Sequence, residues 1–262
     1  MTETVLSIQN LHKTFGGVVA TKDFSLDINH GQIIGLIGPN GAGKNTMFNM
    51  ITGIYKPDSG SIKFLGQDIV GKKPFQIANM GIARTFQNIR LFTNLSALQN
   101  VIMACHEDCN YSHIEAALHI GRYHKMEEQV RDKALELLRT VGLEDDAKRI
   151  AGSLPYGHQR RLEIARALAI NPRLLLLDEP AAGMNAEEST DLCGFIMDLK
   201  QKFDLTIFLI EHHMDVVVKL VEGVSVLNFG ECICQGTPDE VIRDKRVIEA
   251  YLGEEGVRAA SK

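Results

Sequence analysis

Seven residues near position 40 have types and a spacing that could bind phosphate. They are Gly38, Pro39, Asn40, Gly41, Ala42, Gly43 and Lys44. A glycine, four residues, a glycine and a lysine form the pattern of a phosphate-binding loop. The glycines let backbone N–H groups approach phosphate oxygens, a helix N-terminus adds partial positive charge, and Lys44 supplies a full charge. An ordinary strand-to-helix turn is the weaker alternative, because an apolar strand precedes these residues and a helix is predicted to follow.

The residue after the lysine departs from this pattern. The pattern has Ser or Thr there, whose hydroxyl binds Mg²⁺, whereas this chain has Asn45 followed by Thr46. An amide oxygen can bind Mg²⁺, but the asparagine side chain is longer and planar, and the ion demands near-octahedral geometry at short distance. Thr46 lies about 100° further around the helix and cannot simply replace Asn45. We expect both residues at the nucleotide, with weakened Mg²⁺ coordination by Asn45.

Two acids follow an apolar run downstream. Residues 174–177 are four leucines, and Asp178 and Glu179 come next. A buried strand would bring Asp178 beside the phosphate loop, where its carboxylate can hold Mg²⁺ directly or through water. Glu179 would then polarise the attacking water. Acids at a strand end are also commonly solvated without any catalytic role. The two acids therefore indicate a catalytic site mainly because the chain also has a phosphate loop.

A second apolar strand, residues 206–210, ends in Glu211, His212 and His213. A histidine at this strand end could contact the γ-phosphate and hold the attacking water in line. His212 is the better candidate because it comes first after Glu211. A lone histidine is more often structural, so the residue type alone is weak evidence.

Alternating strands and helices must position these residues. Strands are predicted over residues 5–14, 24–28, 32–37, 61–65, 174–177 and 206–210, with a terminal hairpin of 224–228 and 232–235. Helices are predicted over 43–52, 159–170, 187–203 and 214–221, and residues 95–140 show helical patterning only. The alternation implies an α/β core with parallel strands. The helical middle implies a subdomain inserted into that core.

Composition narrows the class of protein. The chain has 262 residues, a formal net charge of −5 and no long basic run, so we expect no nucleic-acid partner. No stretch approaches the ~18–20 consecutive apolar residues that a membrane span needs. The start, Met-Thr-Glu-Thr, lacks the features of a secretory signal. We expect a cytosolic protein, for which any role at a membrane must come through a partner.

The five cysteines are scattered, and we expect free thiols. Four potential metal ligands cluster in the middle of the chain, namely Cys105, His106, Cys109 and His113. A zinc site is conceivable there, but the ligands do not match the paired spacings of structural zinc sites. Cys232 and Cys234 alternate along a predicted strand, which indicates a shared strand face.

Together with the segments between them, these motifs resemble the ATP-binding subunits of ABC transporters. A stretch upstream of Asp178 resembles the family's signature and consists of Leu154, Pro155, Tyr156, Gly157, His158 and Gln159. Gln87 resembles the Q-loop glutamine, for which the resemblance implies a part in catalysis and Mg²⁺ binding. Phe15 occupies the place of the aromatic that stacks on adenine, His212 that of the switch histidine, and residues 182–185 resemble the D-loop. The resemblance extends from Phe15 to about Leu252.

The resemblance implies an α/β fold, a P-loop NTPase core of ABC ATPase type with an N-terminal antiparallel β subdomain and an inserted α-helical subdomain. A single ABC ATPase domain would fill residues 1–262, with a catalytic core of 1–88 and 160–262 and a helical subdomain with the signature at about 89–159. ATP and Mg²⁺ would be the cofactors. The chain would form a head-to-tail pair with a second ABC ATPase, the same or different, with two ATP molecules at the interface.

Membrane partners follow from the same resemblance. They would be inner-membrane permease subunits and, indirectly, a periplasmic substrate-binding protein. The chain would be peripheral, at the cytoplasmic face of the inner (plasma) membrane. We expect the groove that couples it to the permease near residues 87–98, although Ile89, Leu91 and Phe92 could equally form subdomain core.

A finer resemblance points to the larger ATPase of branched-chain amino acid importers. It rests on residues 84–92, 160–166, 180–185, 210–214 and 236–238. Urea-type importers and lipopolysaccharide exporters share several of these stretches, so other cargo stays open. A regulatory ABC protein that hydrolyses ATP poorly is a further alternative.

The signature also departs from the family pattern. Its second residue is usually Ser, whose hydroxyl meets the γ-phosphate of the opposite subunit, and here it is Pro155. Proline suits the first turn of a helix, so the helix can form while the hydroxyl is lost. In a heterodimer, Asn45 and Pro155 would fall in different composite sites, whereas in a homodimer they would share every site. We expect slow but nonzero ATP hydrolysis.

Overall fold

The computed structural model describes residues 3–106 and 122–251, which fold into two compact units. The first unit comprises Met1–Arg84 and Arg173–Lys262, and the second comprises Thr85–Pro172. Within the described ranges, none of the helices has both the length and the apolar character needed to cross a membrane.

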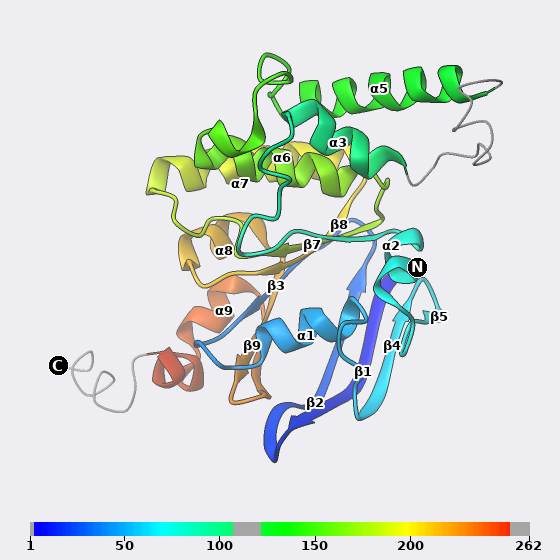
Figure 1. The fold of residues 1–262 in the computed structure, drawn as a ribbon. Coiled ribbons are helices and arrows are strands. Elements are labelled where there is room, and N and C mark those ends of the chain that lie inside the picture. Colours follow the sequence, from blue (N-terminus) through cyan, green and yellow to red (C-terminus); the bar gives the residue numbers. More distant parts are fainter. Residues whose placement is uncertain (1–2, 107–121, 252–262) are drawn as a thin grey trace. The chain divides into compact units, whose positions relative to one another are not determined.

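The first unit is built on one mixed sheet (Figure 1). Its strands, in spatial order, are β5 (Gln67–Asp68), β4 (Ser59–Phe64), β1 (Thr4–Phe15), β2 (Val18–Asn29), β10 (Glu231–Gly236), β9 (Gly223–Asn228), β3 (Ile33–Ile37), β8 (Thr206–Ile210), β7 (Leu174–Asp178) and β6 (Ile82–Arg84). Pairing is antiparallel from β5 to β2 and parallel from β9 to β6. All residues of β3, β7 and β8 are buried, as expected of parallel strands covered on both faces.

Helices of the first unit pack around this sheet. Among its described residues they include α1 (Lys44–Ile51), α2 (Pro74–Asn79), α7 (Ala186–Phe203), α8 (Met214–Leu220) and α9 (Pro238–Arg243), and residues 245–251 are also helical. Helix α1 buries Met47, Phe48 and Ile51 in a core that includes residues of both the antiparallel and the parallel strands. The rings of Phe48 and Phe208 lie 5.2 Å apart, which ties α1 to β8.

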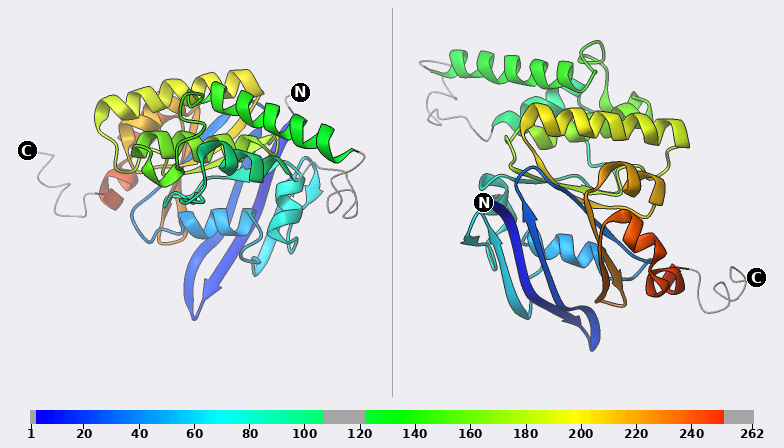
Figure 2. Two further views of the ribbon diagram at one scale, coloured as in Figure 1. Left: turned by 45° about the horizontal axis from the view of Figure 1, so that its top comes forward. Right: turned by 180° about the vertical axis from the view of Figure 1, so that it is seen from behind.

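The second unit consists of helices packed on one another (Figure 2). Among its described residues they are α3 (Ala97–Cys105), α5 (Tyr123–Thr140), the short 3₁₀ helix η2 (Ala151–Ser153) and α6 (Tyr156–Leu168). The Ser96 hydroxyl caps α3 by accepting from the Gln99 N–H. One face of α5 is buried through Val130, Ala134 and Leu138, the helical period that its sequence predicts.

The predicted fold class is confirmed by this architecture, and the predicted helices and strands of the core are present. The sequence did not predict β5, β6, α2 and α9, each of which has at most six residues. Elements that short carry too little periodicity to detect. Residues 160–168 of α6 lie in the second unit. The sequence instead predicts that the helical subdomain ends at residue 159. The division into a catalytic core and a helical subdomain stays a prediction.

The suggested zinc cluster is only partly covered by the structure. Cys105 is buried at the end of α3, and the His106 ring nitrogens contact the Ile102 carbonyl and the Glu127 carboxylate. Cys109 and His113 lie outside the described residues, so the site stays untested. Cys232 and Cys234 lie two residues apart on β10, and both are half-buried.

Candidate nucleotide-binding site

The predicted phosphate loop joins β3 to α1, the context that the motif requires. Gly43 adopts a left-handed φ of 105° at the N-cap of α1. A Cβ on Gly43 would lie 2.1 Å from the Ala20 carbonyl oxygen, and one on Gly38 would lie 2.1 Å from the Leu227 carbonyl oxygen. Only glycine therefore fits at these two positions, where the loop passes against β2 and β9.

Lys44 is the first residue of α1, and its side chain folds back over the loop. Its Nζ donates to the carbonyl oxygens of Gly38 at 2.7 Å and Pro39 at 3.1 Å. Burial lowers the pKa of Lys44, whereas the Glu179 and Asp178 carboxylates raise it. On the same first turn Asn45 is exposed and Thr46 is half-buried.

Three neighbouring strands bring the other predicted site residues to the phosphate loop. Strand β8 pairs in parallel with β3 on one side and with β7 on the other. The carboxyl ends of parallel strands meet at the same edge of the sheet. The loop after β3, His212 after β8, and Asp178 and Glu179 at the end of β7 therefore share one edge of the first unit. The motifs that the sequence pointed to separately are brought together here.

Asp178 makes a buried ion pair at this edge. Its Oδ2 accepts from the Arg84 guanidinium at 2.7 Å, and the two side chains are 3% and 7% exposed. Arg84 also donates to Asn49 Oδ1 on α1 at 2.7 Å. Sequence reasoning missed Arg84 as a site residue, because its position depends on β6 pairing beside β7.

Glu179 and His212 face each other across the ends of β7 and β8. Glu179 is buried, has a left-handed φ of 44°, and donates its N–H to the Ile210 carbonyl at 2.9 Å. Its Oε2 lies 3.5 Å from His212 Nδ1. The His212 side chain is 42% exposed, so one side of the ring is open to a ligand. This pair can bind and orient a water molecule.

Phe15 ends β1 and is partly exposed. Its ring lies 5.1 Å from that of Tyr55 in an edge-on arrangement. The end of β1 is fixed by Asp58, which accepts from Lys13 Nζ, the Thr14 N–H and the Thr14 hydroxyl. These bonds, that of Lys13 first, lower the pKa of Asp58 to about 2. An exposed, anchored aromatic ring of this kind can stack on a nucleobase.

The predicted signature lies in the second unit, at the start of α6. Pro155 is the N-cap residue, and apart from the chain neighbours and the backbone of α6 itself, no atom of the described residues lies within 4 Å of where a Cβ on Gly157 would be. The His158 ring contacts the Asp146 carboxylate at 2.7 Å, and the Gln159 amide donates to the Leu154 carbonyl at 2.8 Å. The N-terminus of a 13-residue helix is thus open at Gly157, as anion binding requires.

The backbone at Gln87 is held by two buried residues of α6. The Arg160 guanidinium donates to the carbonyl oxygens of Phe86 at 2.7 Å and Gln87 at 3.0 Å, and to Glu163 at 2.8 Å. Glu163 in turn accepts from the N–H groups of Phe86 and Arg90. Burial raises the pKa of Glu163, and the Arg160 charge acts in the opposite direction. Sequence reasoning quoted this pair only as part of a motif and missed its contacts with the Gln87 segment.

Comparison with known proteins decides the family. A profile described as ABC transporter matches residues 21–182. The chain belongs to the ABC transporter family. A second profile, described as branched-chain amino acid ATP-binding cassette transporter, matches residues 231–257.

Individual relatives match most of the length of this ABC protein. The high-affinity branched-chain amino acid transport ATP-binding protein BraF of Pseudomonas aeruginosa is 40% identical over 254 residues, 97% of this chain and 100% of the relative. The ADP conformation of MJ1267, an ATP-binding cassette of an ABC transporter, superposes with a TM-score of 0.83 at 34% identity, covering 97% and 100% of the two chains. The dimeric, post-hydrolysis MJ0796 cassette bound to ADP and Pi gives 0.74 at 25% identity, covering 89% and 98%.

Proposed function

We propose that this ABC protein is the ATP-binding and ATP-hydrolysing subunit of an importer for branched-chain amino acids. The observation that carries the ATPase part is the shared edge of β3, β8 and β7. A phosphate loop, a buried Asp178, and the facing pair of Glu179 and His212 meet there, 3.5 Å separating the last two. These are the parts that hydrolysis of a nucleoside triphosphate needs.

Each group of the site has one role in the proposed hydrolysis of ATP. The loop N–H groups and Lys44 bind the phosphates of ATP, and Phe15 stacks on the base. Glu179 polarises a water molecule that His212 helps to hold in line with the γ-phosphorus. The water oxygen bonds to the γ-phosphorus as the bond to the bridging oxygen breaks, one water proton stays on the phosphate and the other is released, which yields ADP, phosphate and a proton.

The oxygen donors at this edge fit Mg²⁺, which prefers carboxylate, amide and water oxygens. We propose Asp178 and Asn45 as ligands, and Gln87 as the further ligand that its resemblance to the Q-loop glutamine implies. Bound Mg²⁺ would neutralise charge on the β- and γ-phosphates. Asn45 offers an amide oxygen in place of the usual hydroxyl. We therefore expect ATP hydrolysis by this chain to require a higher Mg²⁺ concentration.

A second ATPase subunit completes the proposed site. The open helix N-terminus at Gly157 would face the γ-phosphate bound by the partner in a head-to-tail pair. The dimeric state of the MJ0796 cassette supports such a pair. We further propose that the chain is peripheral at the cytoplasmic face of the inner membrane, with permease subunits and, indirectly, a periplasmic substrate-binding protein as partners.

Two observations favour a second candidate, a regulatory ABC protein with weak hydrolysis. Asn45 and Pro155 each replace a residue whose hydroxyl serves Mg²⁺ or the γ-phosphate. In a heterodimer each composite site would lack one hydroxyl, and in a homodimer every site would lack both.

The proposed cargo, branched-chain amino acids, is supported by the branched-chain amino acid match at the C-terminus and by the likeness to BraF.

One experiment separates these functions. In cells that lack the gene, uptake of labelled leucine should return with the wild-type chain and should stay absent with Glu179→Gln. A matched control is Glu187→Gln, which changes an exposed acid on the first turn of α7 and should restore uptake. Uptake that returns equally with Glu179→Gln would favour the regulatory function. Restored urea uptake without leucine uptake would show that the cargo assignment is wrong.

A further inference from the structure

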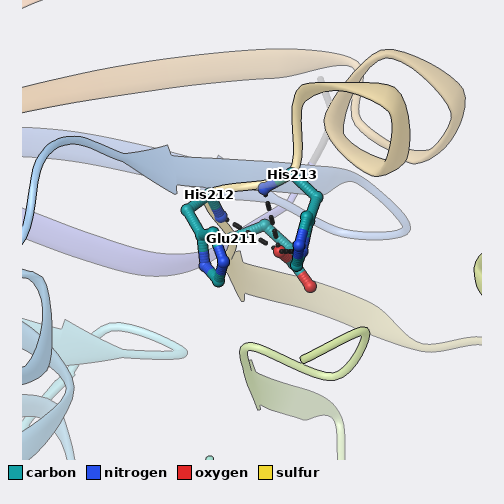
Figure 3. A group of neighbouring side chains, drawn as sticks. All are labelled: Glu211, His212 and His213. Carbon is teal, nitrogen blue, oxygen red and sulfur yellow. Dashed lines mark hydrogen bonds and ion pairs between the residues drawn. The ribbon is translucent and has the colours of Figure 1, made fainter. Parts of the chain in front are cut away.

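The carboxylate of Glu211 lies fully buried just beyond the end of β8 (Figure 3). Its Oε1 accepts from the Ala181 N–H at 3.0 Å. Its Oε2 accepts from the N–H groups of His212 at 3.0 Å and His213 at 3.2 Å, and it lies 3.2 Å from His213 Nδ1. One side chain therefore binds two turns of the backbone at once.

These two turns carry the proposed catalytic groups. The β7–β8 ladder reaches Asp178 opposite Ile210, and the Glu179 N–H bonds to the Ile210 carbonyl at 2.9 Å. Beyond this point the backbone after β7 continues toward Ala181, and the backbone after β8 continues toward His212. The two oxygens of Glu211 join these turns where the described ladder ends. Charge-assisted bonds of this kind are stronger than neutral ones, and leaving buried N–H groups unpaired is costly.

The arrangement also constrains the side chain of His212. The His212 and His213 rings lie 4.1 Å apart with planes tilted by 37°, and His213 is held by Glu211. Glu179 has an uncommon left-handed backbone, which persists only where its surroundings hold it. The separation of 3.5 Å between Glu179 and His212 thus depends on both turns being fixed.

A metal site is the other interpretation of this cluster. Potential ligand atoms of Glu211, His212 and His213 all lie within 4.8 Å of one another. However, Oε2 of Glu211 already accepts the N–H groups of His212 and His213, and an ion bound to this oxygen would have to displace them. The hydrogen bonds favour a brace between two turns.

We propose that Glu211 is a positioning residue for ATP hydrolysis, which sets the placement of Glu179 relative to His212. The proposal rests on the roles proposed above for those two residues. Glu211 need not touch ATP, because its effect passes through the backbone of the two turns. Its loss should therefore lower the rate of hydrolysis while ATP binding at the phosphate loop is kept.

The test is Glu211→Gln in the purified full chain with its partner ATPase. The variant keeps the size of the side chain but replaces one acceptor oxygen by an NH₂ group that faces N–H donors. We expect kcat to fall at least about tenfold and KM for ATP to change less than about threefold. Amide hydrogen exchange should become faster in peptides covering 178–184 and 211–214 and stay unchanged across 33–51. Glu211→Asp, too short to reach both turns, is the second variant if Gln does not fold.

A double-mutant cycle with His212→Ala separates positioning from general stability. If Glu211 acts through His212, adding Glu211→Gln to His212→Ala should lower kcat less than about twofold further. The control is Glu222→Gln, an exposed acid paired with Lys200, which should leave kcat unchanged. An unchanged kcat for Glu211→Gln, or multiplicative losses in the cycle, would refute the proposal. Full activity of His212→Ala and Glu179→Gln would instead overturn the proposed function.

Discussion

The buried ion pair of Arg84 and Asp178 gives the sharpest prediction for stability. Arg84→Met keeps most of the volume of the side chain but removes its charge and its bonds to Asp178 and Asn49, both at 2.7 Å. The two charged side chains are 7% and 3% exposed, so solvent cannot replace the lost partner. Removing one member of a buried pair costs about 3–5 kcal/mol.

This loss converts into a large thermal shift. For a chain of this size, a loss of 1 kcal/mol lowers the unfolding midpoint by roughly 2–4 °C, so Arg84→Met should lower it by roughly 6–20 °C. The chain has no tryptophan, so unfolding is best followed by circular dichroism and calorimetry. The matched control is Arg246→Met, which removes an exposed arginine paired with Asp244. Its midpoint should stay close to that of the wild type because water screens such pairs.

A double variant tests whether the pair itself is responsible. Arg84→Met leaves Asp178 buried without this partner, and Asp178→Asn removes that charge. The double variant should therefore be more stable than the sum of the two single losses predicts, with a coupling of about 0.5–3 kcal/mol. Strictly additive losses, or a midpoint for Arg84→Met like that of Arg246→Met, would refute the reasoning.

Three further predictions concern the nucleotide. Asn45→Thr should raise turnover and lower the Mg²⁺ concentration needed, and equal rates with equal Mg²⁺ dependence would contradict this. Glu179→Gln should trap an ATP-bound pair, which light scattering would detect; only monomers, with ATP and the partner ATPase present, would speak against it. Gly43→Ala places a Cβ 2.1 Å from the Ala20 oxygen and should weaken ATP binding at least about tenfold by calorimetry, so an unchanged Kd would count against the loop assignment.

The sequence predicted the parts of the site that are local in the chain. The phosphate loop is a contiguous motif, and β7 and β8 are apolar runs that end in chemically distinctive residues. Because parallel strands end at one edge of a sheet, these motifs were expected to meet, and they do in the first unit. That topology brings Glu179 and His212 to the ends of adjacent strands.

The residues that hold these groups in place could not be found in this way. Arg84 and Asp178 are separated by 94 positions, and their pairing follows from β6 lying beside β7. In the sequence, Glu211 is an acid at a strand end like many others. Only the folded structure shows that its Oε1 lies 3.0 Å from the Ala181 nitrogen. Both residues lie in stretches that carry the family resemblance, but the resemblance assigned neither a role, and their contacts to Asp178 and Ala181 are tertiary.

The two departures from the family motifs bear on rate more than on fold. Pro155 serves as N-cap of α6, so the helix begins where the signature requires it and only the hydroxyl is missing. Asn45 is exposed on α1, whose core contacts come from the opposite face. Both elements are intact without the two hydroxyls. A partner subunit that carries both hydroxyls would give each composite site one of the two, whereas a second copy of this chain would give it none.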